Sequence, residues 1–456
     1  MKKNYDCLIL GHIVLYDKQI EEGYIAVQDS IIMEIDSISN KNLPSAVEIH
    51  DHRGCFIFPS AIDSQVHSRS QKGQEDFIYT TASAAAGGVG TIIDMPYDEE
   101  FLVSNAKNFN RKKEEATKQA KVDFGLYGTI SPLEGIKHID EIVEAGAIGF
   151  KFSTFSTDPI RFPRIPPYLL YECFEKIASY KLIAGVHNEN DESIRYLITK
   201  YKNENFTDYR SHNLSRPKWT ENIAIVEVYE IAAATGCSAH IVHCSNSRGY
   251  DICLNYRAQG FDTTIETCLH YMVLSEEEDV CQLVGKAKIN PPVRSSKERE
   301  ALWKHLDLGN ITVVSTDHVS WSIDRKSSSN MFENSSGVTG LEVLLPLMVT
   351  EAYKRNINFS KIAKVLAYNP SHLFRIYHKK GALEIGKDAD LVILSKETYT
   401  YNAKDSGINF APWSPYDGKE MLFKVKKHML RGKWIFEDGN ILCNPGYGEF
   451  ISPVRK

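Results

Sequence analysis

Residues 147–189 read AIGFKFSTFSTDPIRFPRIPPYLLYECFEKIASYKLIAGVHNE, and this stretch predicts the fold. It places two short apolar strand candidates, AIGFKFS (147–153) and KLIAGVHNE (181–189), on either side of the helical pattern PPYLLYECFEKIASY (166–180). Parallel strands need a long crossover connection, and a helix is the usual one. The stretch therefore predicts a β–α–β unit of a parallel sheet.

The same alternation of strands and helices extends in both directions, from about residue 58 to about residue 372. Further strand candidates are GTIIDMP (90–96), DFGLYGTI (123–130), SAHIVHCS (238–245), FDTTIETC (261–268) and ITVVSTDH (311–318), and the helical patterns include EDFIYTTASAAAGG (75–88) and ENIAIVEVYEIAAATG (221–236). Alternation over this length predicts an α/β protein with a (β/α)8 TIM-like barrel in residues 58–372.

The two ends of the chain have a different pattern. Runs such as CLILGHIVLY (7–16) and FKVKKHMLRGKWIFEDGNIL (423–442) are β-rich and contain turn residues. Because chain termini often lie close together, we expect residues 1–57 and 373–456 to form one composite β-sandwich domain.

The composition is that of an ordinary globular protein, and it argues against nucleic acids and membranes as partners. A net charge of −6 gives no basic footprint for nucleic acid. No apolar stretch approaches the ~18 residues of a membrane span, and LIL near the N-terminus is too short for a signal peptide. The nine cysteines form no C-x-x-C pair, so we expect reduced thiols and a cytoplasmic protein.

Five polar residues lie where strands of the predicted barrel end: His67, Lys151, His187, His243 and Asp317. In a βα barrel the carboxyl ends of the strands share one face, where active sites form. Taken singly, each residue is better explained as a loop, core, surface or capping residue. As a set, they predict a site for a divalent metal such as zinc, manganese, iron or cobalt.

The chemistry of this set is coherent. Imidazoles and a carboxylate bind such metals. A lysine does so only if carbon dioxide converts its amine to a carbamate. Burial of Lys151 would favour the neutral amine, which this conversion needs. A metal-bound water becomes hydroxide near neutral pH and can attack an amide carbonyl. Asp317 can take up the proton and deliver it to the leaving nitrogen, so it is the candidate catalytic residue.

The order of the motifs resembles the cyclic-amide branch of the amidohydrolase superfamily, which includes allantoinases, hydantoinases, dihydropyrimidinases and dihydroorotases. The resemblance spans nearly the whole chain and includes FPSAIDSQVHSRSQ (58–71), GFKFS (149–153), VHNEN (186–190), SRPKWTENIAI (215–225), HIVHCSNSRG (240–249), NPPVRSSKEREALW (290–303) and STDH (315–318). GVTGLEVLLPLMVTEA (337–352) is most similar to allantoinases.

The resemblance implies a hydrolase that opens a cyclic amide or ureide ring, with one or two divalent ions, zinc first, in each subunit of a homotetramer. It implies that a carbamylated Lys151 bridges the metals, that His187 and His243 bind one ion and that His67 binds the other. It makes Asp317 both a ligand and the proton shuttle. Arg69 matches a residue that pairs with an anionic part of the substrate, although a surface salt bridge explains it equally well.

Four positions depart from the family pattern. Gln65 stands where a second histidine would complete a His-x-His pair, and a glutamine oxygen is a weaker ligand. Ser156 replaces a substrate-holding tyrosine, Asn290 replaces a serine before Pro291, and Ser336 replaces an asparagine; we take these three as candidate substrate-binding residues.

These departures allow two interpretations of the function, one as an enzyme and one as a non-catalytic protein. We favour an active hydrolase, with Gln65 as an altered ligand, and its substrate could be another purine-derived ring. The alternative is a weakened or non-catalytic scaffold similar to the dihydropyrimidinase-like proteins. Glu266 and His270 also lie at a strand end, where they could orient a ligand.

Overall fold

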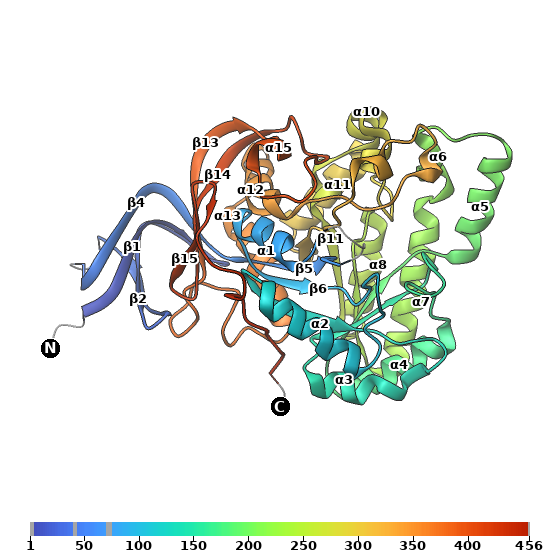
Figure 1. The fold of residues 1–456 in the computed structure, drawn as a ribbon, viewed down its shortest axis with the longest axis horizontal. Helices are drawn as coiled ribbons and strands as arrows, with labels where there is room; N and C mark the ends of the chain where they lie inside the picture. Colours follow the sequence, from blue (N-terminus) through green and yellow to red (C-terminus); the bar gives the residue numbers. More distant parts are fainter. Residues whose placement is uncertain (1–3, 40–42, 70–74, 455–456) are drawn as a thin grey trace.

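The structure, a computed structural model, describes residues 4–39, 43–69 and 75–454 and contains two eight-stranded sheets (Figure 1). In the first sheet the strands follow chain order from β5 to β12, and neighbouring strands are parallel. These strands are β5 (Ala61–Val66), β6 (Val89–Asp94), β7 (Asp123–Gly128), β8 (Gly149–Ser153), β9 (Ile183–His187), β10 (Ser238–Ile241), β11 (Thr263–Cys268) and β12 (Val313–Ser315).

This sheet closes into a barrel at the seam between its first and last strands. Val66 and His318 form a parallel bridge, and the His67 backbone N–H donates to the His318 carbonyl at 3.0 Å. The predicted TIM-like barrel is confirmed, and strands β6 and β9 are buried along their whole length, as expected of strands covered on both faces.

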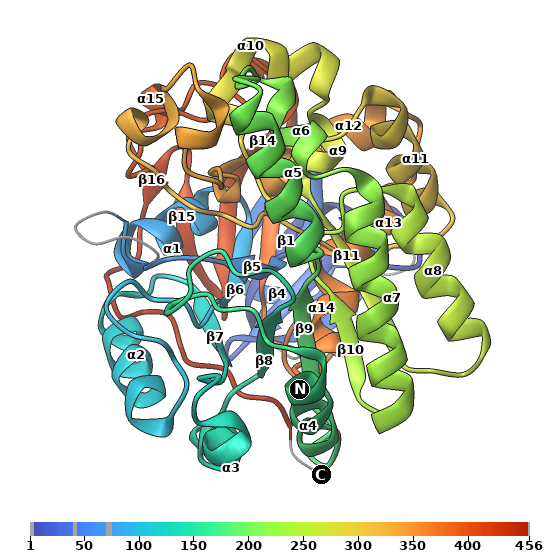
Figure 2. The same ribbon diagram turned by 90° about the vertical axis from the view of Figure 1, so that its right-hand side faces the viewer.

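Helices surround the barrel strands in the order that the sequence predicts (Figure 2). The main helices are α1 (Phe77–Ala86), α2 (Ala106–Gln119), α3 (Ile139–Ala145), α4 (Pro167–Ala178), α5 (Asp191–Asn203), α6 (Arg210–Ser215), α7 (Lys218–Thr235), α8 (Ser247–Ala258), α11 (Ser296–Asp307) and α12 (Leu344–Lys354). Shorter helices are α9 (Leu269–Val273), α10 (Cys281–Leu283), α13 (Phe359–Ala363), α14 (Asn369–Leu373) and α15 (Ala403–Ser406).

The second sheet joins the two ends of the chain beside the barrel (Figure 1). Its order is β16-β15-β14-β13-β4-β1-β2-β3, and β4 pairs with β13 through contacts such as Ile57 with Ile393. The strands are β1 (Asn4–Val14), β2 (Gln19–Gln28), β3 (Ile31–Ser37), β4 (Ser45–Pro59), β13 (Leu391–Thr400), β14 (Glu420–Leu430), β15 (Lys433–Glu437) and β16 (Asn440–Ile441). Both ends therefore build one sheet, while the domain boundaries at 57/58 and 372/373 stay a prediction.

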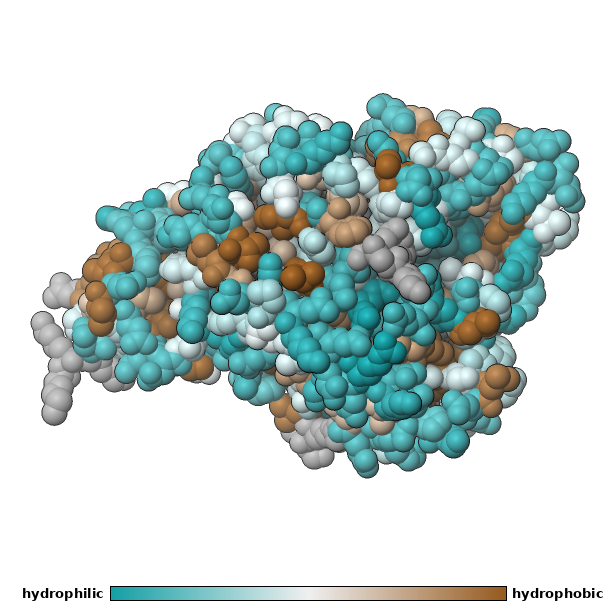
Figure 3. Space-filling model, in the orientation of Figure 1, coloured by the Kyte–Doolittle hydropathy of each residue, from teal (hydrophilic) through white to brown (hydrophobic). Residues whose placement is uncertain are grey.

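The surface is mainly hydrophilic on the face shown in Figure 3, where hydrophobic residues form separate groups. Among the described residues, no helix has both the length and the apolar character needed to cross a membrane.

Candidate active site

A cavity of about 300 Å³ opens at the carboxyl ends of the barrel strands. Eight of the ten residues predicted for the site line it: Gln65, His67, Lys151, His187, His243, Asn290, Asp317 and Ser336. The five strand-end residues predicted from the sequence therefore line one cavity.

The strands explain why these side chains converge. Gln65 lies in β5 and Lys151 in β8, while His187 is the last residue of β9. His243 and Asp317 follow β10 and β12 and have positive φ values of 40° and 49°, a left-handed conformation that non-glycine residues rarely adopt. Strained backbone of this kind is concentrated at functional sites, where the surrounding structure holds it in place.

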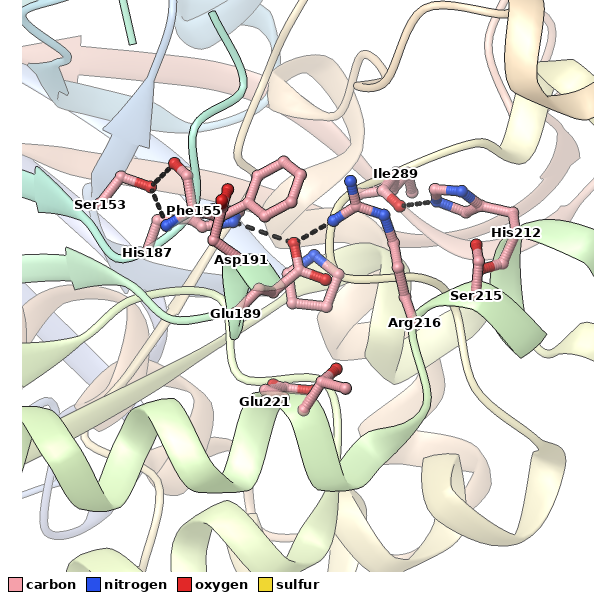
Figure 4. Close-up of polar contacts among 12 residues, drawn as sticks. Ser153, Phe155, His187, Glu189, Asp191, His212, Ser215, Arg216, Glu221 and Ile289 are labelled. Atoms are coloured by element: carbon pink, nitrogen blue, oxygen red, sulfur yellow. Dashed lines mark hydrogen bonds and ion pairs between the residues drawn. The ribbon is translucent and has the colours of Figure 1, made fainter. Parts of the chain in front are cut away.

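The imidazoles of His187 and His243 face each other. Nδ1 of His187 lies 2.9 Å from Nε2 of His243, and the two rings are nearly perpendicular. On its other side, Nε2 of His187 lies 3.0 Å from Oε2 of Glu189, which also forms an ion pair with Arg216 (Figure 4). Because a carboxylate accepts hydrogen bonds, Glu189 holds the proton on Nε2 and leaves the lone pair of Nδ1 directed toward His243.

Electrostatics favour the neutral form of both rings. Burial lowers the pKa of His187 despite the opposing effect of Glu189. Burial, together with the neighbouring imidazole of His187, lowers the pKa of His243 well below its usual value. Neutral imidazole is the form that binds a metal. Glu189 stays ionised because Arg216 and His187 outweigh its burial and lower the pKa of its carboxyl group.

Asp317 lines the same cavity and has two polar neighbours. Its Oδ1 accepts a hydrogen bond from Nε2 of Gln65 at 2.8 Å and lies 3.3 Å from Nε2 of His67. Burial opposes ionisation of Asp317, but the contact with His67 and the neighbouring imidazoles hold the pKa of that carboxyl group well below its usual range. Asp317 is therefore a carboxylate at neutral pH.

Lys151 is almost fully buried and lines the same cavity. Burial lowers the pKa of its amine to about 8, while the negative charges of Asp317 and Glu266 act in the opposite direction. The Tyr97 hydroxyl and the Thr129 hydroxyl donate to the Lys151 carbonyl at 3.2 Å and 2.6 Å and fix the middle of β8. A low pKa makes the neutral amine available, as formation of a carbamate requires.

A second layer of buried carboxylates supports the site from within the barrel. Asp63 accepts a hydrogen bond from the Thr316 hydroxyl at 2.5 Å and so fixes the backbone next to Asp317. Glu266 accepts hydrogen bonds from the Ser64 hydroxyl at 2.5 Å and from the His243 backbone N–H at 3.4 Å. Glu266 thus contacts the backbone of a predicted ligand rather than its imidazole.

The imidazoles and the carboxylate of this site are suitable ligands for a divalent metal, although they are not arranged as a complete metal-binding site. Among residues 4–39, 43–69 and 75–454, no three histidine, cysteine, aspartate or glutamate side chains are grouped as a metal site. Nδ1 of His243 and Oε1 of Gln65 are buried and have no hydrogen-bond partner among the described residues, and the lone pair of His187 faces His243. The two facing imidazole nitrogens of His187 and His243 are the donors that a divalent ion would use there.

Two predicted substrate-binding residues lie elsewhere. Arg69 forms ion pairs with Asp76 at 3.6 Å, Asp98 at 3.9 Å and Glu115, and its position fits the salt-bridge alternative. Ser156 uses its backbone N–H to reach Asp191 at 2.9 Å, outside the cavity lining. The neighbouring loop contributes Thr157, Asp158, Arg161 and Phe162 to the cavity wall instead.

Two residues with a clear part in the site were not predicted from the sequence: Glu189 and Arg216. Glu189 occurs in the motif VHNEN and Arg216 in SRPKWTENIAI. The two residues are 27 positions apart in the sequence, and this spacing alone does not show that their side chains are in contact. Lys326 is a third; its Nζ donates to the carbonyls of Ser335 and Gly337, both at 2.8 Å, and so shapes a segment that lines the cavity.

Comparisons with known proteins agree with this geometry. The model of the amidohydrolase family matches residues 56–435. The chain is 32% identical over 411 residues to an allantoinase of Rubrobacter xylanophilus, with 89% of each chain covered, and 29% identical over 456 residues to an L-hydantoinase of Paenarthrobacter aurescens, with 98% of each covered.

Among solved structures, the L-hydantoinase (dihydropyrimidinase) from Arthrobacter aurescens has a TM-score of 0.93 at 28% identity, covering 98% of this chain and 100% of that one. A D-hydantoinase structure has a TM-score of 0.90 at 25% identity, with 99% of both chains covered. The protein therefore belongs to the amidohydrolase family, in its branch of allantoinase- and hydantoinase-like enzymes.

Proposed function

We propose that this enzyme hydrolyses an amide bond of a small cyclic amide or ureide and opens the ring with the help of a bound divalent metal. The observation that supports this proposal is the single cavity wall formed by His67, Lys151, His187, His243 and Asp317. The names of the relatives, allantoinase and hydantoinase, point to the same class of substrate.

Zinc is the first choice of metal, with manganese, iron and cobalt as alternatives. His187 and His243 would hold it through the facing nitrogens, and Lys151 would join them as a carbamate. The metal would polarise the ring carbonyl and increase the acidity of water. Glu189 and Arg216 keep the ring of His187 in the required tautomer.

Asp317 would act as the proton shuttle. Its ionised Oδ1 accepts the proton of the attacking water and then donates that proton to the ring nitrogen. A C–O bond forms, the ring C–N bond breaks, and the product contains one added water. Gln65 and His67, both in contact with Oδ1, hold the carboxylate in place during these transfers.

The remainder of the cavity suits a small, flat and polar ring. The buried amide oxygen of Asn290 has no partner within the described part of the chain, so it can accept a hydrogen bond from a ring N–H. Ser336 faces the same space, and Tyr97, Phe162 and Trp321 form aromatic walls. A cavity of about 300 Å³ is at the small end of the range for ligand sites.

A ring-opening assay tests the proposal. The purified protein, loaded with zinc, is offered allantoin, hydantoin, dihydrouracil and dihydroorotate, and mass spectrometry follows the gain of one water. We expect one ring to be opened by the wild type and by the surface variant Arg210→Met, and by neither His243→Ala nor Asp317→Asn. Arg210 is a suitable control because it is half exposed and pairs with Asp208 outside the cavity.

No turnover of any ring by protein that carries metal would refute the proposed substrate class. No turnover by protein that binds no metal would favour the non-catalytic scaffold instead.

The resemblance also implies a homotetramer, and we include a homo-oligomer in the proposal. Helix α7 has exposed apolar side chains at Trp219, Ile223 and Val226, which are 49%, 49% and 40% exposed and lie on one helix face by their spacing. A second copy of this chain would cover such a face. Light scattering after gel filtration should show a tetramer, and Ile223→Lys should lower its mass if α7 is in the interface.

A further inference from the structure

Gln65 contacts Asp317 through the nitrogen of its amide group. Nε2 of Gln65 donates to Oδ1 of Asp317 at 2.8 Å, and the Gln65 side chain is almost completely buried. The same oxygen lies 3.3 Å from Nε2 of His67, so two nitrogen groups converge on one carboxylate oxygen.

The charge of Asp317 determines which end of the amide faces it. A carboxylate repels an amide oxygen and attracts an N–H, so the nitrogen belongs where the structure places it and Oε1 is turned away. Oε1 is buried, and none of the residues that the structure describes forms a hydrogen bond with it. The group that Gln65 presents to the Asp317 oxygen is therefore a hydrogen-bond donor, which cannot serve as a metal ligand.

The imidazole pair differs in this respect. Nδ1 of His187 and Nε2 of His243 are 2.9 Å apart, and Glu189 directs the lone pair of Nδ1 toward the gap between the rings. Two nitrogens bound to one tetrahedral zinc ion at the usual bond length lie about 3.3 Å apart. The pair therefore needs only a small separation to accept an ion, whereas the Asp317 side must first lose a hydrogen bond.

We propose that this chain binds one divalent metal per subunit, at His187 and His243 with Lys151, and that the amide of Gln65 takes the place of a second ion by holding Asp317. This inference rests on the proposed function for the presence of a metal. It assigns Asp317 to hydrogen bonding and proton transfer rather than to metal binding, and it makes His67 dispensable for the ion.

Metal content measured by elemental mass spectrometry on zinc-loaded, desalted protein tests the inference. We expect one zinc per subunit in the wild type, one in Gln65→Ala and one in His67→Ala. Gln65→His adds an imidazole beside Asp317 and should hold two. His243→Ala should hold none, and circular dichroism and thermal unfolding of each variant identify any that fail to fold.

Several results would overturn the inference. They are two ions in the wild type, no ion in the folded wild type, one ion in a folded Gln65→His, or loss of the ion in a folded His67→Ala. The ring-opening assay separates this inference from the proposed function. One ion without turnover contradicts only the function, and turnover with two ions contradicts only the single-metal site.

Discussion

The ion pair between Arg216 and Glu189 links the orientation of His187 to the stability of the fold, and Arg216→Met tests that link. The two side chains are 6% and 1% exposed, so the pair is buried. Removing one partner of a buried pair leaves an unpaired charge and costs about 3–5 kcal/mol. Methionine keeps apolar contact with the Phe155 ring, over which the guanidinium lies at 4.5 Å, so the substitution removes mainly the charge.

The entropy of unfolding converts this loss into a shift of the melting temperature. Folded proteins gain about 2.1 cal/mol/K per residue on unfolding, which is about 1 kcal/mol/K for 456 residues. Differential scanning calorimetry should therefore show a Tm lower by about 3–5 °C. Arg210→Met is the matched control, because its pair with Asp208 is 53% and 41% exposed and should cost less than about 1 kcal/mol.

The effect should also depend on pH, with a sign that the pKa of Glu189 determines. In the folded protein the pKa of the Glu189 carboxyl group is lowered from its ordinary value of 4.5. Its stabilising contribution is therefore present above pH 4.5 and is lost as the pH falls below that value. The difference in Tm between the wild type and Arg216→Met should shrink over the same range.

Two further measurements separate the charge from the packing and connect the pair to the metal. The double variant with Glu189→Gln and Arg216→Met removes both charges and should recover more than half of the lost Tm. Arg216→Met should weaken zinc binding about 10–100-fold in a chelator competition, because Glu189 no longer holds His187 in place. A Tm loss no larger than that of Arg210→Met would mean that the buried pair does not stabilise the fold, and an unchanged zinc affinity would mean that it does not position His187.

Three other substitutions test separate parts of the site. Asp317→Asn should lower kcat about 10²–10⁴-fold while metal content stays unchanged, since it removes the proton acceptor; a normal kcat would exclude that role. Lys151→Ala should abolish metal retention, and full metal content in this variant would contradict the role of Lys151 as a ligand. Intact-mass spectrometry of the wild type should show one added carbon dioxide on that lysine. Lys326→Met removes the donor to the carbonyls of Ser335 and Gly337, and each unpaired carbonyl costs about 1–3 kcal/mol. The variant should raise KM about 10-fold or more and leave the metal content unchanged. An unchanged KM would show that this lysine does not shape the substrate site.

The barrel and the strand-end residues could be predicted from the sequence because both depend on local patterns. Apolar runs alternating with helical patterns identify a parallel sheet, and parallel strands bring their carboxyl ends to one face whatever the sequence separation. His67, Lys151, His187, His243 and Asp317 were found in this way.

The contacts between side chains could not be predicted in the same way. Gln65 could be recognised as a departure, but its bond to Asp317 spans 252 residues and depends on the closure of the barrel. Glu189 and Arg216 lie in quoted motifs whose loops meet only in three dimensions. Arg69 and Ser156 were assigned by position in a motif, and tertiary contacts with Glu115 and Asp191 direct them elsewhere.

Metal removal followed by reconstitution tests whether the enzyme needs an ion at the His187–His243 pair to open a cyclic amide ring. The protein is treated with a chelator, its zinc content is measured, and ring opening is followed as zinc is added back. We predict no turnover without metal and full recovery at one zinc per subunit. Undiminished turnover in protein shown to be free of metal would mean that ring opening does not depend on an ion at this pair.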